Sequence, residues 1–143
     1  MRKIKGWIAL LSISLVLFSC SCSKPNGAVF DESTTESAQT LGYEQITQEE
    51  AKRLMDTETD YVIVDARTEE EYNEGHIEGA ILIPEYEIGE RAPKELPQKD
   101  QLILVYCRSG RRSKIASQAL ADLGYTNVKE FGGIIDWEYG VVK

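Results

Sequence analysis

A single cysteine stands at the head of a short, strongly basic stretch. The stretch reads Cys107-Arg108-Ser109-Gly110-Arg111-Arg112 and follows the apolar run from Leu102 to Tyr106. A thiol attacks as its thiolate, and nearby positive charge together with inward-pointing backbone N–H groups favours that form. The same features attract an anionic substrate and stabilise an anionic intermediate. The pattern therefore predicts a nucleophilic cysteine in an anion-binding loop; the alternative is a buried core cysteine beside a basic, solvated turn.

The residues on either side indicate how this loop is positioned. A run as short and as uniformly apolar as 102–106 predicts a strand buried on both faces, as in a parallel sheet. After the loop, apolar residues recur at helical spacing up to a glycine typical of a helix end: Ile115, Ala116, Ala119, Leu120, Leu123 and then Gly124. Cys107 is thus expected at the carboxyl end of a strand, where open α/β sheets bind their ligands.

The loop from Cys107 to Arg112 resembles the active-site loop of the rhodanese family of sulfurtransferases. Further motifs follow the order that the family shows. The amino-terminal signature of the family is matched by Val64-Asp65-Ala66-Arg67, by Glu71-Tyr72 and by the run 75–80, with Ile83-Pro84 after it. The carboxy-terminal signature is resembled by Gly132-Gly133 and Trp137. The resemblance covers about residues 43–143. It implies an α/β fold, a rhodanese-like open parallel β-sheet with helices on both faces, which the predicted alternation of strands and helices also favours.

The resemblance also implies sulfur transfer by ping-pong covalent catalysis. The Cys107 thiolate would attack the outer sulfur of a small anionic donor such as thiosulfate and become a persulfide. A thiol or cyanide would then accept the sulfur. The donor would be held by the rest of the loop: Arg108, Ser109, Gly110, Arg111 and Arg112. No metal or organic cofactor is implied, and the cysteines and the single histidine lack metal-ligand spacing.

Three further residues are expected to support the site rather than to react. Asp65 and Arg67 would hold the neighbouring strand end and loop through an ion pair or hydrogen bonds. His76 could act as a general base for Cys107, but the resemblance implies a turn in which its ring packs and bonds to the backbone. An anion-binding loop can activate a thiol without such a base. Trp137 is expected in the core.

Two other functional classes remain open. Phosphatases of the same fold have a loop one residue longer, with arginine six positions after the cysteine; here Arg112 comes five positions after Cys107 and Ser113 follows it. The shorter loop suits a sulfur-centred anion better than a phosphate ester. The second class is a non-catalytic rhodanese module that binds a partner, or a slow enzyme that serves as a sulfur carrier or redox sensor. The presence of Cys107 counts against a pure binding module.

The first residues predict export. Residues 1–5 are basic, and the run from Ile8 to Phe18 is apolar apart from two serines, which is typical of a secretory signal and short for a membrane span. Leu17-Phe18-Ser19-Cys20 resembles a bacterial lipobox, which implies cleavage before Cys20, a lipid on its sulfur and an extracytoplasmic, membrane-anchored protein. The alternatives are Cys22 as the lipid site, an uncleaved anchor, and a plain secreted protein.

The sequence therefore predicts a signal peptide at 1–19, a flexible tether at 20–42 and one domain at 43–143. Within the domain, Thr-x-x-Glu patterns predict helices from Thr47 to about Met55 and from Thr68 to about Glu74. Strands are expected at 61–64, 80–83 and 128–131, with Ile46 in a short strand or packing ahead of the first helix. Broken or short helix is expected at 85–99, and a turn into a short helix at Gly132-Gly133.

The charge balance limits the partners. The chain has 24 acidic and 16 basic residues, a net charge of −8; without the three basic residues of the leader, 24 acids face 13 bases, which gives about −11. An acidic surface argues against nucleic acid and leaves the basic loop as a local attraction for anions. Cys107 is the sole cysteine within 43–143, so the domain is expected to hold no internal disulfide. We expect a monomer.

Overall fold

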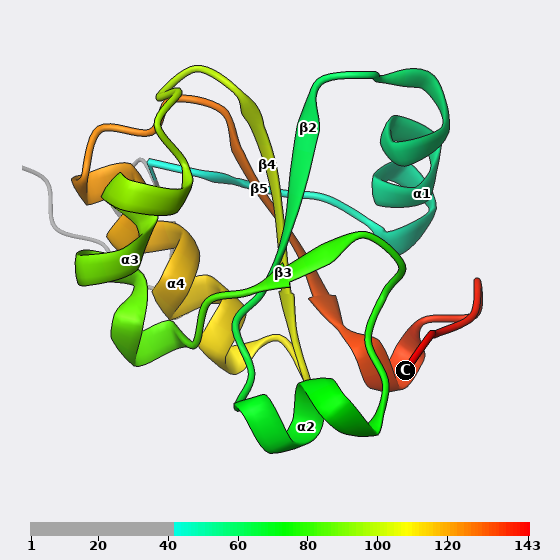
Figure 1. Ribbon diagram of the computed structural model, residues 1–143. Coiled ribbons are helices and arrows are strands. Elements are labelled where there is room, and N and C mark those ends of the chain that lie inside the picture. Colours follow the sequence, from blue (N-terminus) through cyan, green and yellow to red (C-terminus); the bar gives the residue numbers. More distant parts are fainter. Residues whose placement is uncertain (1–41) are drawn as a thin grey trace, which may run out of the picture. The chain divides into compact units, whose positions relative to one another are not determined.

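The structure, a computed structural model, describes residues 42–143, which form an α/β domain around one parallel sheet (Figure 1). The strands are β1 (Glu44–Gln45), β2 (Tyr61–Asp65), β3 (Ala80–Leu82), β4 (Leu102–Cys107) and β5 (Val128–Gly133). They lie in the order β1-β5-β4-β2-β3, and each neighbouring pair is parallel. The prediction of an open parallel sheet is confirmed, and the strand that ends at Cys107 lies at its centre.

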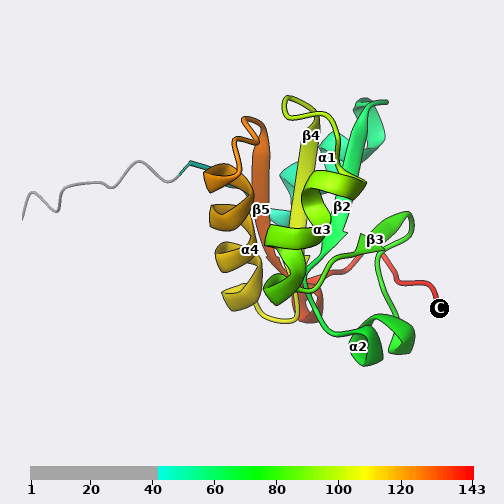
Figure 2. The ribbon, with the colours of Figure 1, turned by 60° about the vertical axis from the view of Figure 1, so that its left-hand side comes forward.

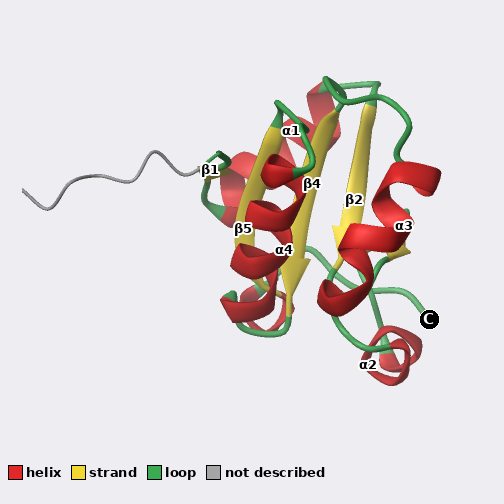
Figure 3. Ribbon diagram, turned by 90° about the vertical axis from the view of Figure 1, so that its left-hand side faces the viewer, coloured by secondary structure: helices red, strands yellow, loops and turns green. Residues whose placement is uncertain are grey.

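Helices cover both faces of this sheet, as predicted. They are α1 (Gln48–Thr57), α2 (Glu69–Glu74), α3 (Ile88–Glu95) and α4 (Arg111–Asp122), with 3₁₀ turns at Glu85–Glu87 and Ile134–Asp136. Figures 2 and 3 show α3 and α4 side by side on one face and α1 on the other. The short α2 lies beyond the end of β2, beside the start of α4 (Figure 1).

The side chains of β4 alternate between two cores. Ile103, Val105 and Cys107 belong to the core that α3 and α4 cover. Leu104 and Tyr106 belong to the core that α1 covers. All six residues of the strand are buried, which confirms the prediction made from the apolar run. Fully burying one large aliphatic side chain stabilises a fold by about 1.5–3 kcal/mol, so this strand anchors both layers.

Threonine side chains begin both helices predicted from the Thr-x-x-Glu pattern, but the two helix starts differ. At α2, the hydroxyl of Thr68 accepts the Glu71 N–H at 3.3 Å, and the Glu71 carboxylate accepts the Thr68 N–H at 3.2 Å. At α1, Thr47 accepts the Glu50 N–H at 3.2 Å, whereas the Glu50 carboxylate binds Arg53 instead. Helix α1 also continues to Thr57, two residues beyond the predicted end.

The last strand is longer than predicted. We expected a turn at the two glycines after Phe131, but β5 continues through Gly133 because this residue pairs with Cys107 at the end of β4. In contrast, β3 ends at Leu82, one residue early. The prediction of broken or short helix at 85–99 is confirmed by the 3₁₀ turn and α3, whose last turn contains Pro93.

The predicted signal peptide, the lipobox at Cys20 and the tether up to residue 41 lie outside the described residues. Within residues 42–143, no helix is long and apolar enough to cross a membrane. The same part of the chain contains no group of three or more His, Cys, Asp or Glu side chains placed to hold a metal ion.

Candidate active site

Cys107 ends β4, and the loop that leads to α4 curls back over its sulfur. The Gly110 N–H donates to Cys107 Sγ at 3.1 Å. Gly110 has a φ of +91°, a left-handed conformation that glycine adopts without steric cost. On its other side the loop packs on Gly133 of β5, where a Cβ atom would lie 2.4 Å from the carbonyl oxygen of Arg108. These two glycines let the chain enclose the sulfur, and Cys107 is only 1% exposed.

The surroundings lower the pKa of the Cys107 thiol below its ordinary value. Burial by itself raises this pKa, because a dry environment disfavours the thiolate. The Ser113 hydroxyl, when its proton turns toward the sulfur, and the backbone amides of Ser109, Gly110 and Ser113 can donate to the thiolate, and these hydrogen bonds outweigh the burial. The unpaired N–H groups at the start of α4 add partial positive charge. The loop therefore favours the nucleophilic form of the sulfur without a histidine base.

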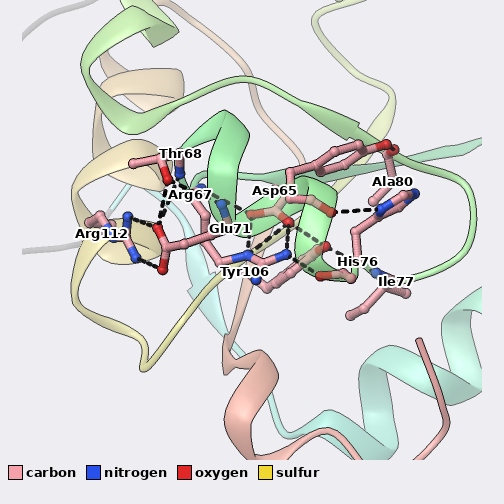
Figure 4. Close-up of polar contacts among 11 residues, drawn as sticks. Asp65, Arg67, Thr68, Glu71, His76, Ile77, Ala80, Tyr106 and Arg112 are labelled. Atoms are coloured by element: carbon pink, nitrogen blue, oxygen red, sulfur yellow. Dashed lines mark hydrogen bonds and ion pairs between the residues drawn. The ribbon is translucent and has the colours of Figure 1, made fainter. Parts of the chain in front are cut away.

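The three arginines of the loop differ in their contacts. Arg108 and Arg111 are exposed to solvent. Arg112 is held by Glu71 of α2: its Nη1 and Nη2 donate to the two carboxylate oxygens at 2.6 and 2.8 Å (Figure 4). This ion pair lowers the pKa of Glu71 from 4.5 to about 2. The hydrogen bonds to Glu71 raise the pKa of Arg112, the charge of Cys107 adds a smaller contribution, and the ion pair ties α4 to α2.

Asp65 and Arg67 form a buried ion pair at the end of β2, as the sequence predicts. Arg67 Nε and Nη2 donate to the Asp65 carboxylate at 2.9 and 2.6 Å, and the Tyr106 hydroxyl donates to it at 2.6 Å (Figure 4). The same hydroxyl accepts the Ile77 N–H at 3.1 Å. Burial, and then the charge of Asp65, raise the pKa of Tyr106. The network joins β2, β4 and the turn before β3 on the α1 side of the sheet, the side opposite to Cys107.

The structure places His76 in that turn before β3. Its Nδ1 lies 3.1 Å from the Tyr72 carbonyl oxygen, and the two rings stack with 3.8 Å between their centroids. The His76 backbone N–H donates to the Val142 carbonyl at 2.9 Å. These contacts fix the ring within its own turn. Trp137 packs against Phe131, with ring centroids 5.6 Å apart, and belongs to the α1-side core.

A buried carboxylate that we did not predict for the site reaches the loop from β5. Glu130 is 3% exposed, and its Oε1 accepts the Ser113 hydroxyl at 2.6 Å and the Gly132 N–H at 2.9 Å. The Ser113 Oγ lies 3.5 Å from Cys107 Sγ and 3.1 Å from the Gly110 carbonyl oxygen. A continuous path of polar contacts therefore runs from Cys107 through Ser113 to Glu130.

The sequence holds a weak signal for this carboxylate. Glu130 follows Val128 by two residues in a predicted strand, so both side chains share a face, and an acidic residue on an apolar face indicates a polar partner in the interior. Nothing in the sequence indicates that this partner is Ser113, which lies 17 positions away. The contact between Arg112 and Glu71 had no signal in the spacing, because the two residues lie 41 positions apart.

Both the sequence and the fold of this chain are similar to those of known proteins. A model of the rhodanese-like domain family matches residues 47–139. The chain is 41% identical over 80 residues to the thiosulfate sulfurtransferase PspE of Escherichia coli strain K12, over 56% of this chain and 77% of that protein. It is 34% identical over 107 residues to the putative sulfur carrier protein YrkF of Bacillus subtilis strain 168, over 74% of this chain and 56% of that protein. A solved rhodanese with anions from E. coli superposes with a TM-score of 0.55 at 38% identity, covering 58% of this chain and 98% of that one.

A parallel sheet with a thiol at the carboxyl end of its central strand, covered by the loop that follows it, defines a class of α/β domains with a cysteine at the candidate site. The family match over 47–139 and the similarity to the E. coli protein then identify the family. The chain belongs to the rhodanese-like domain family.

Proposed function

We propose that this protein is a sulfurtransferase that carries sulfur on Cys107 as a persulfide. The observation that carries this proposal is the enclosed thiol, 3.1 Å from the Gly110 N–H and at the N-terminus of α4. A relative named thiosulfate sulfurtransferase supports sulfur transfer as the activity and thiosulfate as one donor. The donor class is a small anion with a terminal, transferable sulfur, and the acceptor is a thiol or cyanide.

The reaction has two steps. In the first, the Cys107 thiolate attacks the outer sulfur of thiosulfate, the bond between the two thiosulfate sulfurs breaks, and sulfite leaves with the electron pair. In the second, the acceptor attacks the outer sulfur of the persulfide and the Cys107 thiolate leaves. The amides of the loop stabilise the anionic sulfur in both states. The exposed Arg108 and Arg111 attract the donor, and Arg112 adds its charge from the ion pair with Glu71.

The enclosure of the sulfur favours a donor with a small reacting atom. Cys107 is 1% exposed, and the loop places only five residues between it and Ser113. A single terminal sulfur can approach such a thiolate end-on, whereas a phosphoryl group brings three oxygens that each need donors. The tight enclosure of the sulfur therefore favours sulfur transfer over phosphatase activity.

A sulfur carrier is the second candidate function. The similarity to a putative sulfur carrier protein of B. subtilis supports it. A carrier would form the same persulfide but pass the sulfur to a partner protein, so its turnover with cyanide would be slow. Both candidates share the first step and differ in the acceptor.

Peptide mass spectrometry after incubation with thiosulfate tests this proposal. We expect the mass of one extra sulfur atom on the Cys107 peptide, which cyanide then removes. Cys107→Ser keeps the size of the side chain but removes the soft, ionisable sulfur, so sulfur transfer should fall to background while the fold is retained. Turnover of an aryl phosphate without a Cys107 persulfide would contradict the proposal and favour a phosphatase; a persulfide that forms but does not turn over with cyanide would favour the carrier.

For location, we propose an extracytoplasmic protein held to the cell membrane by a lipid on Cys20. The support is the basic start, the short apolar run and the Leu17-Phe18-Ser19-Cys20 motif. A diacylglyceryl group carries two acyl chains, and two lipid chains give stable anchoring where one is marginal.

A further inference from the structure

Glu130 is a buried charged group beside the site to which the proposed reaction assigns no role. Its exposed fraction is 3%, and two donors converge on its Oε1: the Ser113 hydroxyl at 2.6 Å and the Gly132 N–H at 2.9 Å. The bond to Glu130 is the shortest contact of the Ser113 hydroxyl, which is the donor in it, so the Ser113 proton points toward Glu130 in this arrangement. The oxygen of Ser113 then presents a lone pair to Cys107 Sγ, 3.5 Å away.

We propose that Glu130 is a positioning residue that restrains thiolate formation at Cys107 by holding the hydroxyl proton of Ser113. The inference rests on the proposed role of Cys107 as the nucleophile. In this proposal Glu130 adjusts the reactivity of the Cys107 sulfur and does not contact the sulfur donor.

The Ser113 hydroxyl has a single proton, which it can donate to only one strong acceptor at a time. While Glu130 holds that proton, Ser113 can accept a hydrogen bond from the Cys107 thiol but donates none to a thiolate. A thiolate gains the hydroxyl as a donor only if Ser113 gives up the shorter bond to Glu130. The carboxylate thus competes with the sulfur for one donor, and its negative charge further disfavours a second anion nearby. The Gly110 N–H remains as a donor to the sulfur in both states.

Other charged and titratable groups also face this pair. Arg112 faces Cys107 from α4, and the exposed Arg108 and Arg111 belong to the same loop. Tyr43, ahead of β1, faces Glu130, and its pKa is raised by its burial and by the charge of Glu130. All of them are retained when Glu130 is replaced by glutamine, so a change in sulfur reactivity in that variant reports on the carboxylate.

The test measures the reactivity of Cys107 in the full chain from pH 5 to pH 9. Iodoacetamide is the probe, and peptide mass spectrometry resolves Cys107 from Cys20 and Cys22. We expect Glu130→Gln to alkylate about three- to tenfold faster at pH 6, with the midpoint of the profile at lower pH, because the rate follows the thiolate fraction. The matched control is Ser117→Ala, one helical turn further along α4; Ser117 is buried and its hydroxyl has no partner, so its loss should leave the profile unchanged.

A double-mutant cycle tests whether the effect passes through Ser113. In the Ser113→Ala background, Glu130→Gln should change the alkylation rate by less than half as much. If Glu130→Gln does not fold, Glu130→Asp withdraws the carboxylate by one methylene and should raise the rate in the same direction. Unchanged or slower alkylation in the folded variants, or an undiminished effect in the Ser113→Ala background, would overturn the inference.

The probe also separates this inference from the proposed function. Alkylation needs no sulfur donor, so a faster rate in Glu130→Gln supports the role of Glu130 whatever the thiosulfate assay shows. If alkylation is faster in Glu130→Gln but no sulfur transfer from thiosulfate is detected, only the sulfurtransferase proposal is contradicted.

Discussion

The three arginines of the loop differ in their surroundings, and within the described residues only Arg112 of the three is tied into the fold by an ion pair. Arg108 and Arg111 face solvent, where they can meet an anionic donor. Arg112 uses both ends of its planar fork on Glu71, with an exposed side-chain fraction of 20%. A bidentate arginine–carboxylate pair holds both partners in a fixed geometry. Arg112 therefore fixes the first turn of α4 against α2, and with it the amides around Cys107.

Removal of Arg112 should reduce both stability and sulfur transfer. Arg112→Ala leaves Glu71 without its main partner, and we expect it to lower the free energy of unfolding at pH 7 by about 1–2 kcal/mol after allowance for solvent screening. The pKa of Glu71 is lowered from 4.5 to about 2, so the ion pair stabilises the fold above about pH 4.5 and its contribution is lost as the pH falls toward 2. The difference between wild type and variant should therefore shrink over that window in urea unfolding measured at several pH values.

The control for this prediction is Arg111→Ala, which removes an exposed arginine of the same helix turn. We expect it to change the unfolding free energy by less than about 0.5 kcal/mol. An Arg112→Ala variant as stable as Arg111→Ala at pH 7, or a difference that persists at pH 2, would contradict the role assigned to the ion pair.

The sequence predicted where the candidate nucleophile lies but not the partners of its neighbours. The apolar run predicts the strand before Cys107, and apolar residues at helical spacing predict the helix after it. The pairing of Arg112 with Glu71 depends on how α2 packs against α4, which local patterns do not encode. The contact between Glu130 and the loop was missed for the same reason, since its partner Ser113 lies on another element.

At the scale of elements, the contact between the end of β5 and the loop after β4 decides whether the sulfur is enclosed. Gly133 has an ordinary extended backbone, with a φ of −119°, so the constraint here is space. A Cβ atom there would lie 2.4 Å from the carbonyl oxygen of Arg108 and 2.6 Å from the Cα of Ser109. Both are backbone atoms, which move only if the whole loop moves.

Gly133→Ala should therefore displace the loop. We expect the unfolding free energy to fall by about 1–3 kcal/mol, as for other overpacking changes, and sulfur transfer to fall further because the amides no longer converge on Cys107. The control is Gly89→Ala in α3, where a Cβ meets no atom within 4 Å; it should be neutral or stabilise the helix by up to about 1 kcal/mol. Thermal unfolding and the thiosulfate assay measure both effects, and a Gly133→Ala variant with wild-type activity would show that the loop does not depend on this contact.

The same glycine explains where the prediction of elements was wrong. Two consecutive glycines are typical of a turn, so we expected the last strand to end at Phe131. Gly133 instead continues the strand because the absence of a side chain lets the loop pack on it. Strands β2, β3 and β4 and helix α4 were predicted from apolar residues, whose pattern reflects burial directly. Strand β1 has no such pattern: it is the exposed pair Glu44–Gln45, just ahead of Ile46, where a short strand was expected. Tertiary contacts, rather than local preference, set the boundaries that differed.

At the scale of the whole chain, the net charge is negative, whereas the loop at the candidate site is positively charged. The net charge is −8, whereas the loop around Cys107 contains three arginines. A small anionic donor is repelled by most of an acidic surface and attracted only close to the loop, within about 8–10 Å at ordinary salt. Added salt should therefore change the KM for thiosulfate modestly, because the short-range contacts in the loop are screened least. Steady-state assays at low and high ionic strength, with kcat as the internal comparison, measure this effect.

The anchor belongs to this scale as well, because a lipid on Cys20 would place the described domain at the end of a tether of about twenty residues next to the membrane. We expect the protein in its native bacterial host to lose the leader before Cys20 and to carry two acyl chains on that sulfur, which hold it in the membrane fraction. Cys20→Ala should leave the leader in place or release the domain into the soluble fraction, while sulfur transfer by the domain is unchanged, because Cys107 lies in a separate part of the chain. Cys22→Ala is the matched control and should leave both the lipid and the membrane attachment intact. Mass spectrometry of the mature amino terminus decides the outcome: a lipid on Cys22, or a terminus elsewhere without lipid, would show that the motif at Cys20 is not the anchor.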